Sequence, residues 1–475
     1  MQRNGAPAGR RVVVVGGGIS GLAAAHALGR DAPPGTDVVL LDGASVLGGK
    51  LRVSEVAGVP VDEGAEMFLA GRATDAIALT RAVGLADQLV HPVTTAASVL
   101  VNGVPRPLPA GTLLGVPTDL DALRGAGVLS RAGLAEVEAE QGRPAERLDG
   151  DVGVGEYVGR RLGREVVQRL VDPLLGGVYA GRADLLSLRA TMPALAERLD
   201  AAGGSLLAAA RAVVAEAPGA AGPAFGTLRA GLGALPAAVA RAAAADVRLG
   251  LPVRRIEPAA AGFRVVAGPV PSPTVLDADA VIVAVPAAKA APMLATVAPA
   301  AAAELAAIEY ASMAIVTLAY PASVARRLTG SGLLVPATEG RAVKALTYST
   351  SKWPHLAGRA VAVLRASVGR YGEERVLHRD DADLVVLVTA ELAGLVGVEE
   401  PALATRVTRW GGGLPQYAVG HVDRVRRIRA AVARVPGLAV CGAAYEGVGV
   451  PACIRSGQAA GGRVLSHLGS PPAGG

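Results

Sequence analysis

The sequence predicts an α/β fold, in which a discontinuous Rossmann-like domain is combined with a mixed α+β domain and a mostly helical domain. Four consecutive valines at residues 12–15 run directly into a glycine-rich turn and an apolar helix. A short apolar strand and a closing helix return near residues 438–465. Parallel strands that are buried on both faces have such continuous apolar runs. One sheet therefore takes strands from both ends of the chain.

The composition indicates a large globular protein. The chain has 475 residues, of which 51% are hydrophobic and 19% charged, so intrinsic disorder is excluded and two or three domains are expected. Its net charge of +6 comes from scattered arginines without a basic stripe that alternates with aromatic residues, so no nucleic-acid partner is expected. Two cysteines and six scattered histidines predict neither a disulfide framework nor a metal site.

No signal peptide and no membrane span are expected from the sequence. The most apolar stretch, residues 12–28, contains five glycines and a histidine, which makes it a poor bilayer span. The expected location is the cytoplasm, and a weak peripheral contact with the inner face of the cell membrane is left open.

The first element in chain order is a strand at residues 12–15, followed by the pattern G-x-G-x-x-G and a helix that reaches residue 28. In this pattern Gly16 permits the tight turn, Gly18 lets the backbone approach a pyrophosphate, and Gly21 lets helix and strand pack closely. The start of the helix offers free N–H groups and the positive end of its dipole. The second strand, residues 38–41, ends in Asp42, where an acid accepts hydrogen bonds from a ribose.

This turn predicts a dinucleotide cofactor, which on the turn alone could be NAD or FAD. Two features favour FAD. The glycine pair at residues 48 and 49, followed by Lys50, is typical of flavoproteins of the amine oxidase type. The C-terminal strand, Gly442 and a helix with Pro451 in its first turn return as if to cover a flavin ring.

The remaining segments predict the domain limits. Helical periodicity broken by proline- and glycine-rich loops predicts a mostly helical domain at residues 74–223, which is the candidate membrane-facing part. Strand-like alternation around residues 314–319 and 360–368 predicts a substrate-binding domain at residues 287–405. The cofactor domain is then assembled from residues 1–73, 224–286 and 406–475.

Five sequence blocks resemble the FAD-dependent porphyrinogen oxidases, within the amine oxidase-like flavoproteins. Residues 442–457 resemble the C-terminal signature of that family, and residues 173–181, with Tyr179, resemble a second block. Trp410 and residues 414–421 resemble a third. Residues 352–354 and 364–370 are similar to the Gram-positive branch, whose substrate is coproporphyrinogen III. The blocks follow the family order over nearly the whole chain.

The resemblance implies an enzyme of haem biosynthesis. It implies removal of six electrons and six protons from coproporphyrinogen III, giving coproporphyrin III while three O2 become three H2O2, with handover of the product to ferrochelatase. No catalytic side chain is predicted, because the flavin N5 atom accepts the hydride. The positive end of the closing helix would stabilise the reduced, anionic flavin.

The resemblance also assigns cofactor residues. It places Lys50 near the adenine half, the backbone of Val253 at the adenine, Trp410 near the flavin, and backbone N–H groups of residues 448–450 at the isoalloxazine. At residues 64–67 relatives tend to have Gly-Pro-Asp-Ser, and this chain departs from them with Gly-Ala-Glu-Met. The predicted cofactor-binding residues are Gly16, Gly17, Gly18, Ile19, Ser20, Gly21, Asp42, Gly49, Lys50, Gly64, Ala65, Glu66, Met67, Val253, Trp410, Val448, Gly449 and Val450.

Substrate carboxylates require cations. The candidates are Arg72, Lys344, Lys352 and Arg365, and for each the alternative is an ordinary solvated charge. A protoporphyrinogen IX oxidase is the alternative function. More distant alternatives are an amine oxidase, a carotenoid desaturase, and a non-catalytic flavoprotein or porphyrin carrier. The blocks at residues 352–354 and 364–370 argue against the distant enzymes, and the intact cofactor motifs argue against the carrier.

Overall fold

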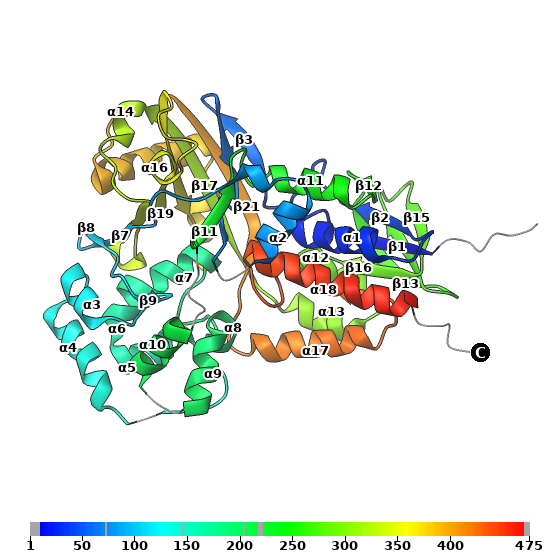
Figure 1. The fold of residues 1–475 in the computed structure, drawn as a ribbon, viewed down its shortest axis with the longest axis horizontal. Coiled ribbons are helices and arrows are strands. Elements are labelled where there is room, and N and C mark those ends of the chain that lie inside the picture. The colour runs from blue at the N-terminus through cyan, green and yellow to red at the C-terminus, as the bar shows by residue number, and fades with distance from the viewer. Residues whose placement is uncertain (1–9, 72–73, 145, 203–204, 217–221, 470–475) are drawn as a thin grey trace, which may run out of the picture.

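The computed structural model describes residues 10–71, 74–144, 146–202, 205–216 and 222–469. A five-stranded parallel sheet lies at the centre of one half of the molecule, in the order β12-β2-β1-β16-β22 (Figure 1). Successive valines of β1 face opposite apolar layers, which is why the whole strand is apolar. The strands are β1 Arg11–Val15, β2 Asp37–Leu41, β12 Asp246–Arg248, β16 Ala280–Val283 and β22 Leu438–Val440.

Helices α1 and α18 lie side by side on one face of this sheet (Figure 1). A Cβ at Gly457 of α18 would lie 2.0 Å from the carbonyl oxygen of Ser20 in α1, so this close approach requires glycine. The helices in this layer are α1 Ile19–Asp31, α2 Asp75–Ala82, α11 Ala234–Ala242 and α18 Val450–Gly469.

An antiparallel three-stranded sheet and three helices cover the opposite face. Their apolar side chains meet Val13, Val15 and the matching residues of the neighbouring strands. The elements are β13 Val253–Pro258, β14 Phe263–Ala267, β15 Thr274–Ala278, α12 Ala287–Leu294, α13 Pro299–Ala306 and α17 His421–Ala433. The predicted α/β class and Rossmann-like arrangement are therefore confirmed.

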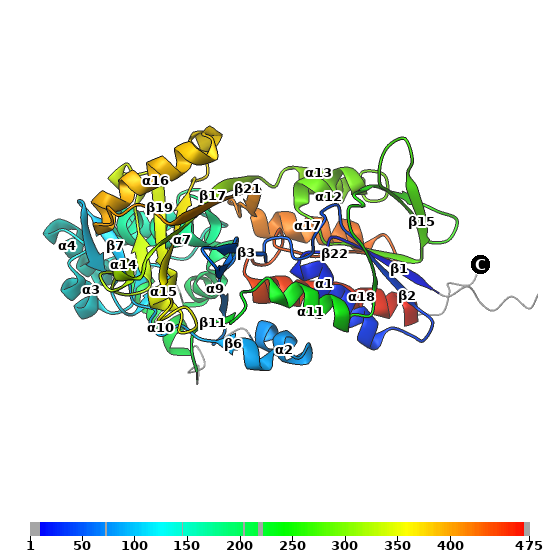
Figure 2. The same cartoon turned by 90° about the horizontal axis from the view of Figure 1, so that it is seen from above.

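A seven-stranded sheet forms the second half, in the order β21-β17-β20-β19-β18-β7-β8. One of its faces packs against the long helix α16 Asp381–Val396 (Figure 2). The strands are β7 Ala97–Val101, β8 Val104–Pro107, β17 Tyr310–Pro321, β18 Gly332–Leu334, β19 Val343–Tyr348, β20 Val361–Val368 and β21 Ala404–Pro415.

The hairpin β3 Val53–Val56 and β4 Val59–Asp62 packs on the other face of this sheet, around the buried Trp353. The hairpin thereby brings the segment after β4 into contact with the seven-stranded sheet. Smaller elements complete this half: β5 Phe68–Leu69, β6 Leu89–Val90, β11 Phe225–Leu228, α14 Ala322–Ala325 and α15 Ser349–Lys352.

A separate helical core is built mainly from residues 120–216. Its elements are β9 Thr112–Leu113, β10 Val116–Pro117, α3 Leu120–Ala126, α4 Arg131–Ala139, α5 Val154–Leu162, α6 Arg164–Val166, α7 Asp172–Tyr179, α8 Leu188–Thr191, α9 Pro193–Ala202 and α10 Leu206–Glu216. Within the described ranges, no helix is both long and apolar enough to cross a bilayer.

Two details of the strand pairing differ from the predicted domain limits. Strands β7 and β8 fall within residues 74–223, yet they pair into the seven-stranded sheet, because β7 runs parallel to β18. Strand β21 begins before residue 406 and pairs with β17 along nearly its whole length. Pairing between distant segments leaves no local signal in the sequence, and the exact division into domains stays a prediction.

Candidate cofactor site and its neighbourhood

The glycine turn connects the carboxyl end of β1 to the start of α1. Gly16 has φ +115°, and a Cβ there would lie 2.8 Å from the carbonyl oxygen of Ala284. A Cβ at Gly21 would lie 1.9 Å from the carbonyl oxygen of Gly16. At Gly18, by contrast, a Cβ would meet nothing within 4 Å. Two of the glycines are therefore required by packing, and the third leaves open space at a helix N-terminus, which is where a diphosphate is bound in such folds.

The start of α18 offers further donors. In the described part of the chain, no acceptor meets the backbone N–H groups of Val448, Gly449 and Val450. The first residues of a helix have N–H groups without intrahelical partners, and these carry the positive end of the dipole. Ser20, at the start of α1, hydrogen-bonds the thiol of Cys453 in the first turn of α18, so the two helix starts lie next to each other. Together they suit an extended anionic cofactor.

Asp42 lies at the end of β2, as predicted. Its Oδ2 accepts the backbone N–H of Gly17 at 2.5 Å and its Oδ1 accepts that of Ala44 at 2.7 Å. Each carboxylate oxygen keeps one further lone pair for a ribose hydroxyl. A Cβ at Gly43 would lie 3.0 Å from the Pro252 side chain, so Val253 lies beside the same end of the sheet. The structure thus brings together the two residues predicted at the adenosine.

Lys50 lies beside residues 64–67 and the start of α18. Its carbonyl oxygen accepts the N–H of Ala65 at 3.2 Å, and its ammonium is near Cys453 of α18. Its expected place near the adenine half stays a prediction. Burial lowers the pKa of Lys50. No hydrogen-bonding or ionic partner for this ammonium is found among the described residues. Lys50 is therefore a free, half-buried cation beside the start of α18.

Residues 64–67 lie between Lys50 and the seven-stranded sheet. A Cβ at Gly64 would lie 2.2 Å from the carbonyl oxygen of Lys50 and 3.2 Å from the ring of Trp410. The Trp410 indole N–H donates to the carbonyl oxygen of Glu63 at 2.9 Å. Trp410, which comes from β21, is therefore packed beside this segment and Lys50. That Trp410 lies near the flavin stays a prediction.

The Glu66 side chain lies in a buried ionic cluster. Its carboxylate pairs with Arg365 and with Lys352, whose Nζ is 3.4 Å from Oε1, and it accepts the indole N–H of Trp353. Arg365 also donates to the Gly64 carbonyl oxygen at 2.7 Å. Burial raises the pKa of Glu66, but Lys352, Arg365 and the Trp353 hydrogen bond outweigh it and lower the pKa to about 2.

This cluster changes the interpretation of two predicted substrate cations. Lys352 and Arg365 share the single carboxylate of Glu66, and Lys352 also contacts the Met67 sulfur at 3.2 Å. Their roles in the structure are to hold residues 64–67 against the sheet. The sequence contains the relevant departure, since Glu66 stands where relatives have another residue, but its partners lie about 290 residues away and could not be inferred.

The other two candidate substrate-binding cations are Arg72 and Lys344. Arg72 lies outside the described residues. Lys344 of β19 is 6% exposed, and its Nζ has no hydrogen-bond partner among the described residues. Burial, together with the positive charge of Arg370, lowers the pKa of Lys344 to about 7. Lys344 is therefore a buried cation without a counter-ion.

Asp62 is a titrating group that the sequence does not single out. It ends β4, is 7% exposed, and accepts the N–H of Leu232 at 2.8 Å. Burial raises its pKa to about 7, although the charge of Arg365 opposes the shift. Asp62, Glu66 and Arg365 line a cavity of about 20 Å³, large enough for a single water molecule. In the sequence, Asp62 could have been noticed as an acidic residue at the end of the otherwise apolar strand β4.

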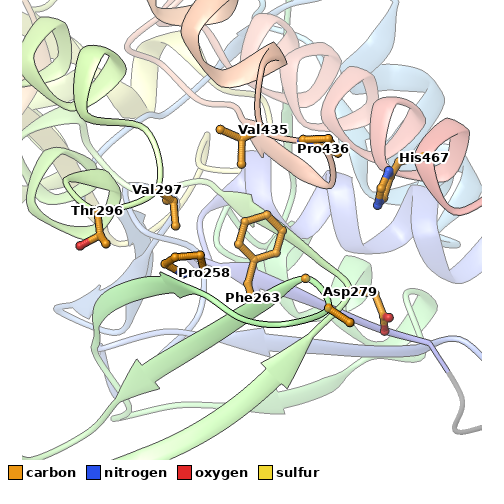
Figure 3. A pocket seen from close by; sticks show the side chains of 10 residues that line it. Pro258, Phe263, Asp279, Thr296, Val297, Val435, Pro436 and His467 are labelled. Carbon is orange, nitrogen blue, oxygen red and sulfur yellow. The ribbon is translucent and has the colours of Figure 1, made fainter. Parts of the chain in front are cut away.

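A larger hollow lies away from all these residues (Figure 3). Its volume is about 450 Å³, and Phe263, Val297 and Val435 form its apolar lining, with Asp279 and His467 beside them. Asp279 precedes β16, so the hollow lies at the amino edge of the parallel sheet. The glycine turn lies at the carboxyl edge, where ligands of this kind of sheet bind. None of the predicted cofactor residues lines this hollow.

Comparison with known proteins decides the family. The description "Flavin containing amine oxidoreductase" matches residues 19–465. The chain belongs to this family. Membership confirms the predicted FAD cofactor and an oxidoreductase function. It agrees with a site in which backbone N–H groups at the starts of α1 and α18 face one extended cofactor.

Within the family, the chain is 36% identical to the coproporphyrinogen III oxidase of Mycobacterium tuberculosis, over 94% of this chain and 95% of that protein. It is 32% identical to the coproporphyrinogen III oxidase of Bacillus subtilis, over 97% and 98%. A solved structure from Exiguobacterium sp. 255-15 has a TM-score of 0.84 and 32% identity, over 96% of this chain and 99% of that chain. The resemblance to porphyrinogen oxidases is thereby confirmed.

Proposed function

We propose that this flavoprotein oxidises coproporphyrinogen III to coproporphyrin III, with O2 as the electron acceptor, in haem biosynthesis. The observation that carries the proposal is the similarity, over more than nine-tenths of both chains, to coproporphyrinogen III oxidases from two distant bacteria. Six electrons and six protons leave the macrocycle, and three O2 become three H2O2. Two helix starts with unpartnered N–H groups support a bound dinucleotide.

The residues present fit FAD. Gly16, Gly18 and Gly21 shape the space for the diphosphate, Asp42 and Val253 flank the adenosine end, and Lys50 and Trp410 flank the other end. When bound, FAD would supply the hydride acceptor for the three two-electron steps that oxidise the macrocycle. The N–H groups of residues 448–450 and the ammonium of Lys50 present positive charge where the reduced cofactor becomes anionic.

The substrate side requires cations. Lys352 and Arg365 share the one carboxylate of Glu66, whereas Lys344 Nζ has no partner among the described residues, so Lys344 and Arg72 are the first candidates for a propionate. Charge-assisted hydrogen bonds to a buried carboxylate are worth roughly 1.5–3 kcal/mol each. Coproporphyrinogen III has four propionates and protoporphyrinogen IX has two, so such contacts favour the first substrate.

The proposed surroundings are the cytoplasm, with weak peripheral contact at the membrane and transfer of the product to ferrochelatase. No helix in the described ranges is long and apolar enough to cross a membrane.

Parallel measurements of kcat/KM with freshly reduced coproporphyrinogen III and protoporphyrinogen IX test the proposal, followed by porphyrin fluorescence and O2 uptake. We expect coproporphyrinogen III to be preferred by about tenfold or more, the factor that one well-buried propionate contact supplies. A preference for protoporphyrinogen IX would reassign the substrate. Oxidation of a primary amine in place of both porphyrinogens, or no O2 uptake at all by the FAD-loaded protein, would overturn the function.

A further inference from the structure

Tyr417 lies where three distant segments meet. Its ring is 1% exposed and stacks on His421 of α17, with centroids 4.0 Å apart and planes inclined by 14°. On the other side Tyr179 of α7 packs against it, with centroids 5.4 Å apart. None of these three side chains is among the predicted cofactor-binding residues. The column therefore joins the helical core to α17 and to the segment that follows β21.

The hydroxyl group of Tyr417 connects this column to the segment between β22 and α18. It donates to the carbonyl oxygen of Ala443 at 2.6 Å and accepts the N–H of Gly447 at 2.8 Å. One oxygen atom thus holds both ends of residues 443–447. Burial raises the pKa of Tyr417 far above its ordinary value, so the donating proton stays in place at all working pH values.

The path of this segment depends on few other side-chain contacts. Gly442 and Gly447 have φ +128° and +133°, a conformation that residues with a side chain rarely adopt. The Gly442 N–H donates to the Ser456 hydroxyl at 3.2 Å, and His421 Nε2 is 3.3 Å from the carbonyl oxygen of Tyr445. Arg429 and Glu446 pair at the surface. The Tyr417 hydroxyl group differs from these groups because it bonds both ends of the segment, directly before residues 448–450.

We propose that Tyr417 is a positioning residue for the flavin: its hydroxyl group fixes residues 443–447 so that the free N–H groups of residues 448–450 face the cofactor. The proposal rests on the proposed function, because that function places residues 448–450 at the flavin. Tyr417 itself does not touch the reacting atoms. It acts through the backbone of the segment that it holds.

The test compares Tyr417→Phe with the wild-type protein. The phenylalanine ring keeps the stacking on His421 and Tyr179, and both hydrogen bonds to the segment are lost. We expect FAD to bind about tenfold more weakly, as two lost hydrogen bonds imply. We also expect a more negative flavin reduction potential, a shifted flavin absorption band, and a lower kcat at little-changed KM.

Two matched variants separate positioning from general stability. Tyr157→Phe removes a buried hydroxyl group of the helical core that has no hydrogen-bond partner among the described residues. Tyr179→Phe removes a hydroxyl group from the same aromatic column and leaves both Tyr417 bonds to residues 443–447 in place. Both should keep the wild-type potential and FAD affinity. If Tyr417→Phe also keeps them, or if Tyr179→Phe changes them equally, the hydroxyl group of Tyr417 has no positioning role.

Amide hydrogen exchange on the wild-type protein needs no variant to fold. Without FAD, the Gly447 amide should be protected and the amides of residues 448–450 should exchange fast, and adding FAD should protect residues 448–450. Unchanged exchange there on adding FAD would overturn the cofactor placement and with it the proposed function's site. Fast exchange at Gly447 would overturn the Tyr417 tether alone.

Discussion

The carboxylate of Glu66 and the guanidinium of Arg365 form a buried ion pair across 299 residues of sequence. Arg365 belongs to the seven-stranded sheet, and Glu66 belongs to the segment that packs beside Lys50 and Trp410. The same guanidinium holds the Gly64 carbonyl oxygen. One arginine thereby fixes both the backbone and the side chain of the segment that joins the two halves of the molecule.

Removing this anion should destabilise the protein strongly. Glu66→Gln leaves Lys352 and Arg365 buried without a counter-ion, and breaking such a pair costs about 3–5 kcal/mol. A lower midpoint of thermal unfolding would report this loss. Because the pKa of Glu66 is lowered from 4.5 to about 2, its stabilising contribution is present above pH 4.5 and disappears as the pH falls towards 2.

A double variant and a surface control make this test specific. Adding Arg365→Met to Glu66→Gln removes one of the unpaired cations, so the double variant should be more stable than Glu66→Gln alone. Glu304 pairs with Arg424 and Arg427 near the surface, and Glu304→Gln should cost less than about 1 kcal/mol. If Glu66→Gln and Glu304→Gln lose the same amount of stability, the buried cluster contributes no more to stability than a surface ion pair.

The local parts of the cofactor site could be predicted from the sequence. The strand, the glycine turn, Asp42 and the closing helix each depend on residues within about two dozen positions, and local spacing determines them. The partners of Glu66 could not be predicted, because an ion pair between distant segments depends on how two sheets pack. For the same reason, the sequence does not show that β7 pairs into the second sheet.

The glycine turn provides a test that separates binding from folding. Gly18 has φ −71° and ψ 171°, which alanine adopts freely, and a Cβ there meets only open space. Gly18→Ala should therefore unfold at the same temperature as the wild type without FAD, yet bind FAD at least about tenfold more weakly, because the methyl group occupies the approach to the diphosphate. Fluorescence titration of the FAD-free protein measures the dissociation constant.

Two other glycines are the controls for this experiment. Gly394 in α16 also has open space around a Cβ, so Gly394→Ala should leave FAD binding unchanged. Gly21→Ala places its Cβ 1.9 Å from a carbonyl oxygen and should prevent correct folding. Wild-type FAD affinity in Gly18→Ala would mean that the diphosphate is bound elsewhere.

Asp62 should make stability depend on pH around neutrality. Its pKa is raised from 3.8 to about 7, so between these values the folded protein holds a proton that the unfolded chain has released. Stability from this group therefore falls as the pH rises from about 4 to 7 and stays low above 7. Asp62→Asn keeps an acceptor for the Leu232 N–H and removes the charge. The unfolding temperature of Asp62→Asn, relative to that of the wild type, should increase between pH 5 and pH 8. If the difference between the two unfolding temperatures does not change with pH, Asp62 is not the source of the pH dependence.

Lys344 offers the sharpest prediction about the substrate, because stability and binding should respond in opposite directions. Its pKa is lowered from 10.5 to about 7 by burial and Arg370, so the folded state loses a proton that the unfolded chain keeps between these values. Stability from this group therefore rises with pH from about 7 to 10.5. Lys344→Met removes an unpaired buried amine, and the variant should unfold at a higher temperature than the wild type, most clearly at or below pH 7.

The same variant should bind the substrate more weakly, because a substrate propionate that contacts Nζ of Lys344 loses this partner. KM for coproporphyrinogen III should therefore rise about tenfold with kcat nearly unchanged. The exposed Lys289 of α12 is the matched control, and Lys289→Met should alter neither quantity. A more stable Lys344→Met with an unchanged KM would place the propionate partners elsewhere and leave Lys344 without a part in substrate binding.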